Sequence, residues 1–343
     1  MSDHVTTTLW HHFGAAIDML ESAIAACPDA PWSDGAKPSF WRIAQHTAYV
    51  TDWYLSNPST PYAPPEPFTS ARLEPAATVA APPYTRDEIL GLVRYDRDKA
   101  RSLFGTLTAE RAAQTWTFGK RAWPLAEWLM YNMRHAQHHA AQLNLLLRQR
   151  TDVVPTWVSR TNADLAAPVH AIPLMPDSLW NQLGAAIDML RNAILACPDA
   201  LWGDRARQPE FWYVAYHTIF FLDYYTSPTA DGFVPPKPFG LEELDPAGVL
   251  PERVFTKDEL LGYLEHGREQ CRRIIESLTD ESAAEVRRFN RQDWTVLEWL
   301  VNSMRHVQHH TAQLHLILRQ QTDSAPGWIA RTSRPLHAAE SPA

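Results

Sequence analysis

The chain has 343 residues, of which 45% are hydrophobic and 20% are charged, and its formal net charge at pH 7 is −8. The length is enough for two domains, and the composition is that of an ordinary globular protein. A net negative charge without any block of lysine or arginine excludes nucleic acid and anionic membrane surfaces as expected partners.

The cysteines and the apolar runs indicate where the protein works. Cys27, Cys197 and Cys271 are too few and too scattered for a disulfide framework, and buried thiols in a reducing cytosol are expected. The first residues lack the basic and apolar regions of a signal peptide. No apolar run reaches the roughly 18 residues of a membrane span. These features predict a cytoplasmic protein without a membrane segment.

The sequence repeats itself once. The segment GAAIDML occurs at residues 14–20 and again at 184–190, and His46 and His217 lie in matching surroundings 171 residues apart. A repeat of this length indicates two copies of one domain. We expect a first domain over residues 1–160, a linker over 161–176 and a second domain over 177–343.

Each half is expected to contain four helices and no competing strand. The first carries an apolar stripe at helical spacing, the second stops before a proline, the third opens with a Thr-x-x-Glu capping box, and the fourth is the longest. In chain order the ranges are about 7–27, 39–56, a helix from Thr85, and 124–149, then 177–197, 210–226, a helix from Thr256, and 295–320.

A long proline-rich segment connects the second and third helices of each half. It contains Pro-Pro-x-Pro-Phe, which ends at Phe68 in one half and at Phe239 in the other. A connection of this length can cross the end of a bundle, and the shared motif favours an ordered cover. The predicted fold is all-α: two tandem four-helix bundles with a long crossover loop. We expect a pseudo-two-fold relation between them, so that the monomer mimics a homodimer.

Histidines recur at matching positions in the two halves. The fourth helix of each half carries two histidines four residues apart, which share one helical face, and the second helix carries one more. Such a pair with a third imidazole from a facing helix makes a three-nitrogen site with an open position, which is typical of catalytic zinc. The predicted metal ligands are His46, His135 and His139 in the first half, and His217, His306 and His310 in the second.

The alternative is that these histidines are buried side chains held by hydrogen bonds, or exposed surface side chains. Their recurrence counts against it, because other histidines do not recur: His11 and His12 align with Asn181 and Gln182. Neighbouring side chains on the fourth helix are candidates to hold the metal ligands in place. These candidates are Gln142, Gln313, His138 and His309.

Three further pairs of shared charged residues lie near the motifs. Each has a structural interpretation beside the functional one: helix capping for the glutamates, helix packing or solvation for the aspartates, and an ion pair or solvation for the arginines. We favour the structural interpretation for all three. The pairs are Glu127 and Glu298, Asp18 and Asp188, and Arg134 and Arg305.

The whole chain resembles two fused copies of the DinB-like (DinB/YfiT) superfamily. The matching motifs are FWxxxxHT at residues 40–47 and 211–218, and HxxHHxxQL at 135–143 and 306–314. The resemblance implies four-helix bundles that carry one divalent metal on three histidines, and position by position it selects the same six histidines. The family often has Arg-Gly between the last histidine and the glutamine. Here Ala-Ala and Thr-Ala stand there, which leaves the ligands intact and changes the pocket.

The resemblance implies a metal-dependent enzyme of the thiol S-transferase type that acts on a small molecule. Relatives include transferases that use bacillithiol or mycothiol, and many members have no known activity. Zinc, nickel or iron in each half, with a low-molecular-weight thiol, would be the cofactors. A metal-binding protein without turnover and a purely structural tandem bundle remain the alternatives. The sequence selects neither the metal nor the substrate.

Overall fold

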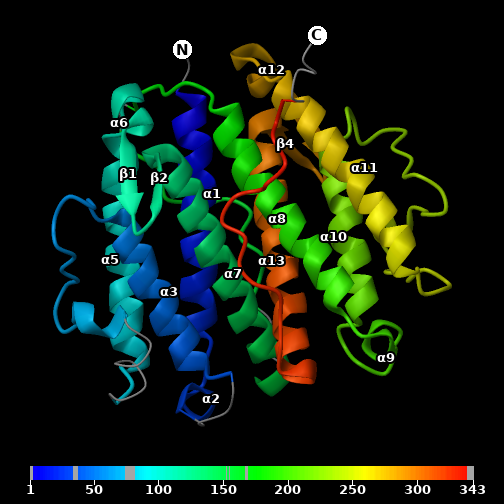
Figure 1. The fold of residues 1–343 in the computed structure, drawn as a ribbon, viewed down its shortest axis with the longest axis horizontal. Helices are drawn as coiled ribbons and strands as arrows, with labels where there is room; N and C mark the ends of the chain where they lie inside the picture. Colours follow the sequence, from blue (N-terminus) through cyan, green and yellow to red (C-terminus); the bar gives the residue numbers. More distant parts are fainter. Residues whose placement is uncertain are drawn as a thin grey trace. The chain divides into compact units, whose positions relative to one another are not determined.

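The structure, a computed structural model, describes residues 3–33, 38–73, 82–151, 153, 155–166 and 169–337. The chain divides into two compact units, Met1–Pro173 and Leu174–Ala343. Each unit is built in the same way around four long helices (Figure 1). The predicted all-α class is therefore confirmed, whereas the two-fold relation between the units stays a prediction.

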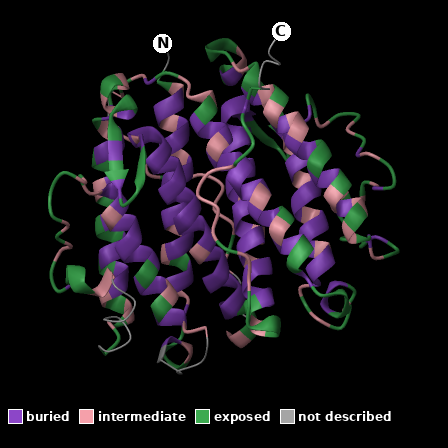
Figure 2. Cartoon of the chain, viewed as in Figure 1, coloured by how far each residue is buried: buried purple, intermediate pink, exposed green. Residues whose placement is uncertain are grey.

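In the first unit, α7 packs against both α1 and α3, and α5 packs against the same two helices. Most residues of α7 and of the inward faces of α1 and α3 are buried (Figure 2). The long helices are α1 (His4–Ala25), α3 (Phe40–Leu55), α5 (Arg86–Gly105) and α7 (Leu125–Thr151). The short elements are α2 (Asp29–Ser33), the 3-10 helix η1 (Ser70–Leu73) and α6 (Ala109–Ala113).

The second unit repeats this arrangement. Helix α13 packs against α8 and α10, and α11 packs against the same two. The long helices are α8 (Pro176–Ala196), α10 (Phe211–Thr226), α11 (Lys257–Glu276) and α13 (Val296–Thr322). The short elements are α9 (Asp199–Trp202), the 3-10 helix η2 (Glu242–Leu244) and α12 (Asp280–Ala284).

The predicted capping boxes form at the helix starts. At each one, the threonine hydroxyl accepts a hydrogen bond from the glutamate N–H, and the glutamate carboxylate accepts one from the threonine N–H. Both N–H groups would otherwise lack a helical partner. The pairs are Thr85 with Glu88, Thr256 with Glu259, and Thr295 with Glu298.

A small antiparallel hairpin precedes the fourth long helix of each unit. The hairpins are β1 (Thr115–Phe118) with β2 (Arg121–Pro124), and β3 (Val286–Phe289) with β4 (Gln292–Thr295). The indole N–H of Trp128 donates to the carbonyl of Trp116 at 2.9 Å, and that of Trp299 donates to the carbonyl of Arg287 at 3.0 Å. The hairpins, which the sequence analysis did not predict, thus fix the starts of the histidine-bearing helices.

The tails of the two repeats pack onto the first helix of each unit. The backbone N–H of Thr161 donates to the carbonyl of His11, and that of Thr332 donates to the carbonyl of Asn181. A β-carbon added at Gly14 would lie only 2.6 Å from the Thr161 Cγ2 methyl. The glycine of the repeated GAAIDML segment is therefore required for close packing of the tail.

The crossover loops pack over the helices as expected, as far as they are described. Phe68 is buried with its ring centroid 5.6 Å from that of Tyr49 on α3, and Phe239 is buried 4.4 Å from Tyr263 on α11. Part of the first loop, residues 74–81, lies outside the described residues.

Candidate metal centres

The first unit brings three histidines together from two helices. His46 comes from α3, and His135 and His139 come from successive turns of α7. One ring nitrogen of each lies within 4.8 Å of those of the other two. The Nε2 atoms of His46 and His135 are 3.2 Å apart.

The second unit repeats this cluster with His217 from α10 and with His306 and His310 from α13. Its ring nitrogens also lie within 4.8 Å of one another. The ring centroids of His217 are 5.2 Å from His306 and 4.8 Å from His310. All six predicted ligand histidines therefore lie in two clusters.

The spacing of the nitrogens fits a divalent ion. Two imidazole nitrogens on a tetrahedral ion at about 2.0–2.1 Å are roughly 3.3 Å apart. The 3.2 Å between the Nε2 atoms of His46 and His135 is close to this value. The donor set is nitrogen only, which suits zinc, nickel or iron and does not suit calcium or magnesium.

A glutamine holds the outer nitrogen of one histidine in each cluster. The Nδ1 atom of His139 lies 2.9 Å from the amide oxygen of Gln142. Because that oxygen only accepts, Nδ1 carries the hydrogen, which leaves the Nε2 lone pair of His139 available to an ion. The amide nitrogen of Gln142 in turn donates to His138 Nε2 at 3.2 Å.

The same chain of contacts occurs in the second unit. His310 Nδ1 donates to the amide oxygen of Gln313 at 2.9 Å, and the Gln313 amide nitrogen donates to His309 Nε2 at 3.3 Å. The four residues named as supports for the ligands thus contact the clusters, and a glutamine lies between the two adjacent histidines in each unit.

The second cluster also contacts one residue that the sequence patterns do not reveal. The Nδ1 atom of His217 lies 2.7 Å from the carboxylate oxygen Oε2 of Glu243, on the 3-10 helix η2. The carboxylate holds the ring so that Nε2 is left for an ion. The aligned position in the first half is Arg72, so a search for shared residues passes over Glu243.

Burial keeps the inner histidines uncharged. The pKa of His135 lies well below its usual range because the ring is buried, and because His139 and His46 lie beside it. The same causes lower the pKa values of His306 and His310, with His217 and His309 as neighbours. At neutral pH these rings are neutral, which is the form that binds metal.

Both clusters are open to solvent on one side. His46 is exposed, His139 is half-buried, and all three histidines of the second cluster are half-buried. On the inner side each cluster meets an aromatic wall: the Tyr54 ring lies 6.5 Å from His135, and the Tyr225 ring lies 6.4 Å from His306. The exposed side of each cluster is therefore the side from which a small molecule could approach.

Three of the six shared charged residues make structural contacts. Glu298 caps α13. Asp18 pairs with Arg97 at 2.7 Å, and Asp188 pairs with Arg268 at 2.6 Å, so both aspartates tie the first long helix to the third and neither orients a histidine in these contacts. Of the two expectations for the arginines, an ion pair or solvation, solvation is wrong, because the side chains of Arg134 and Arg305 are fully buried.

Among the described residues, all three cysteines are free and buried. Burial raises the pKa values of the Cys197 and Cys271 thiols to about 12. At neutral pH these two side chains therefore hold no appreciable thiolate and are not candidate nucleophiles.

Comparison with known families agrees with the two repeats. The model described as "DinB family" matches residues 1–168, and the model described as "DinB superfamily" matches residues 182–314. The chain is a tandem of two DinB-superfamily domains. No match was found among curated proteins or among solved structures.

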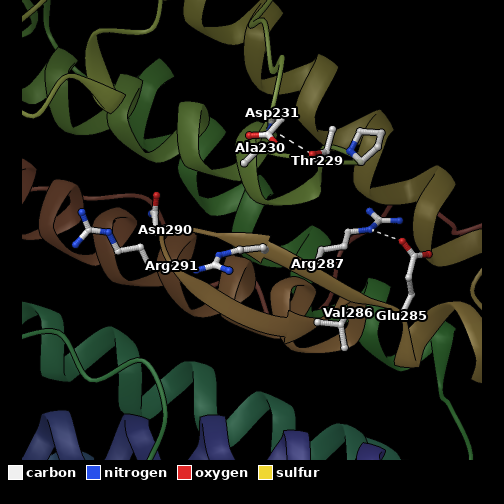
Figure 3. Close-up of a pocket in the computed structure, with 10 residues that line it drawn as sticks. Thr229, Ala230, Asp231, Glu285, Val286, Arg287, Asn290 and Arg291 are labelled. Atoms are coloured by element: carbon white, nitrogen blue, oxygen red, sulfur yellow. Dashed lines mark hydrogen bonds and ion pairs between the residues drawn. The ribbon is translucent and has the colours of Figure 1, made fainter.

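The described helices of this DinB tandem include none that is long and apolar enough to cross a membrane. A cavity of about 380 Å³ lies in the second DinB domain, away from the histidines, between the end of α10 and the β3–β4 hairpin (Figure 3). Arg287, Arg288 and Arg291 line it, and Arg287 pairs with Glu285 at 3.1 Å. None of the six clustered histidines is among its lining residues.

Proposed function

We propose that each DinB domain holds one divalent ion on its three histidines, and that the protein is a metal-dependent enzyme of the thiol S-transferase type. One observation carries the proposal: three imidazoles converge in each unit, and glutamine or glutamate accepts a hydrogen bond from one ring nitrogen, which places the lone pair on the other nitrogen of that ring. A cluster of unrelated buried histidines would not need this repeated orientation.

Three protein ligands leave a coordination position open, as in catalytic zinc sites. Zinc, nickel and iron all accept imidazole, so the donor set suits each of them. A bound ion would lower the pKa of a thiol at the open position and so favour the thiolate. Because imidazole binds a metal as a neutral ligand, three such ligands would leave the positive charge of the ion available to that anion.

The residues of the protein would orient and admit the reactants. Gln142 and Gln313 fix the tautomers of His139 and His310, and the solvent-facing sides of the clusters give a small thiol and its electrophile a path. The thiol sulfur would form a bond to the electrophilic carbon, the leaving group would depart with its bonding electrons, and the thiol proton would pass to solvent. The thiol would be supplied as a cofactor, since all three cysteines of the chain are buried.

The test is a thiol conjugation assay on protein loaded with zinc, nickel or iron(II), with a panel of low-molecular-weight thiols and a chromogenic aryl halide. We expect activity that saturates with thiol, that a chelator removes, and that is absent from the double variant His46→Ala, His217→Ala. If the metal-loaded protein binds neither thiol nor electrophile saturably, the proposed enzyme activity is wrong and the protein binds metal without turnover.

A further inference from the structure

The two clusters share their histidines but differ in the charges around them. In the second unit, Glu243 accepts a hydrogen bond from His217 Nδ1 at 2.7 Å, and the side chain of Glu243 is only 4% exposed. One turn before His217 stands Tyr213, with its ring centroid 6.3 Å from that of His217. The first unit has arginine at both aligned positions, Arg42 and Arg72.

The carboxylate of Glu243 is only partly satisfied by this contact. Its other oxygen, Oε1, is buried, and the neighbouring group that shares the carboxylate is the neutral hydroxyl of Tyr213, whose pKa is raised by burial and by Glu243. A buried carboxylate is costly unless a positive charge or hydrogen bonds offset the cost. A divalent ion held beside it by His217 would supply that charge.

The first unit uses its aligned residue differently. The Arg72 guanidinium lies 4.0 Å from the ring centroid of Tyr84, and its Nη1 donates to the carbonyl of Pro82 at 3.0 Å. Arg42 lies one helical turn before His46, on the same face of α3. The first cluster has no carboxylate at the position of Glu243, whereas the anionic Glu243, in contact with His217, favours a dication beside it.

We propose that the two metal centres are unequal, with the second binding its ion more tightly because Glu243 positions His217 and adds negative charge beside the ion. This inference rests on the proposed function only in that both centres hold a metal. Glu243 acts through His217 and is a positioning residue. Partners of this kind contribute about 10- to 100-fold to metal affinity.

The control is contained in the same 3-10 helix. Glu242 is adjacent in sequence and carries the same charge, but its carboxylate lies 3.4 Å from the hydroxyl of Tyr216 and does not contact His217 in the contacts described. Glu242→Gln thus removes one negative charge from η2 without touching the histidine, and Glu243→Gln removes the charge from the histidine's own partner.

Wild-type protein freed of metal is titrated with Zn²⁺ against a chelator of known affinity, and with Co²⁺ while its visible absorption is recorded. We expect two separable binding steps, with affinities at least about tenfold apart. In the His135→Ala background, where the second centre alone remains, Glu243→Gln should weaken binding by about 10- to 100-fold and change the Co²⁺ spectrum. Glu242→Gln should change neither.

Two equal affinities in the wild-type protein would overturn the inference, and this comparison needs no variant to fold. An unchanged affinity and spectrum in Glu243→Gln would overturn it as well. Unequal metal affinities without any thiol transfer would leave it standing while the proposed reaction fails. Absence of metal binding at both centres would overturn both.

Discussion

Gln142 and Gln313 make equivalent contacts in the two units: each forms hydrogen bonds with two adjacent histidines of its own helix. The amide oxygen accepts from Nδ1 of the proposed ligand, His139 or His310, and the amide nitrogen donates to the neighbouring ring. This bond fixes which nitrogen faces the centre, because a neutral imidazole carries only one hydrogen. The orientation of His139 and His310 therefore depends on a side chain one turn away.

Replacing Gln142 with leucine should lower the metal affinity of the first centre by about 10- to 100-fold. The side chain is buried and leucine has a similar size, so the packing of α7 should survive. The second centre, with Gln313 intact, is the internal control. Gln142→Glu keeps an acceptor for His139 and should bind metal better than the leucine variant. Equal metal affinity in wild type and both variants would show that the glutamine does not orient the histidine.

Asp96 on α5 offers a test of buried charge away from the histidines. Its side chain is buried, neither carboxylate oxygen accepts a hydrogen bond from a described residue, and the nearby Asp52 pairs with Lys99. Burial raises the pKa of Asp96 well above its usual value; the negative charge of Asp52 also raises it, and Lys99 opposes the rise. The carboxyl is consequently neutral in the folded state when the unfolded chain would ionise it.

Because the pKa is raised on folding, Asp96 contributes its full stability below the unfolded value, near pH 4, and this contribution is lost as the pH rises through the folded pKa. In Asp96→Asn the side chain cannot ionise, so the variant does not lose stability in this way as the pH rises. The variant should be more stable than wild type at pH 7 by about 1 kcal/mol or more, with the difference shrinking towards pH 4. Denaturant unfolding at the two pH values measures it. If the stability gain of the variant over wild type were smaller at pH 7 than at pH 4, the pKa of Asp96 would not be raised in the folded state.

At the scale of elements, the tail packs so closely on α1 that no side chain fits at Gly14 while Thr161 is present. Gly91 on α5 is exposed, with nothing within 4 Å of an added β-carbon. Gly14→Ala should destabilise the first unit, since the methyl would meet Thr161 at 2.6 Å. Gly91→Ala should stabilise it by about 0.5–1 kcal/mol through helix propensity. The free energies of unfolding of the two variants should therefore move in opposite directions.

The double variant Gly14→Ala, Thr161→Ala separates packing from helix propensity. It should recover part of the lost stability, because the clash is with the threonine side chain. Equal stabilisation by both single glycine variants would mean that the tail does not lie on α1.

The long helices were predictable because their signals are local. Thr85 and Thr256 begin capping boxes that form as expected, and the apolar stripes ran along the helices that form the bundles. The hairpins were missed because each strand has only four residues, too few for alternation to be read. Their stabilising contacts, such as the Trp128 indole bond to Trp116, join residues whose meeting depends on the folded unit.

The histidine clusters were predictable because the duplication repeats them. The same comparison of the two halves could not reveal Glu243. Comparing the two halves selects what they share, so a residue that contributes to one centre alone, as Glu243 does at His217, gives no signal. Its distance in sequence from His217 also offers no helical spacing to detect. Only the fold of the crossover loop brings the two side chains together.

At the scale of the whole molecule, the chain carries one cluster in each of two separately compact units. Ligands that lie within one unit should bind their ion without help from the other. Removing one centre should consequently leave the other loaded, and an ion that binds only the folded state should stabilise the unit that holds it.

The most direct test of the central claim is the metal content of four proteins after reconstitution with one divalent metal and removal of excess: wild type, His135→Ala, His306→Ala and the double variant. We expect two ions per chain in wild type, one in each single variant and none in the double variant. The matched change His138→Ala removes the hydrogen-bond partner of Gln142 and no ligand, so it should weaken the first centre without abolishing it. Wild type without bound metal, or a double variant that still holds two ions, would contradict the account.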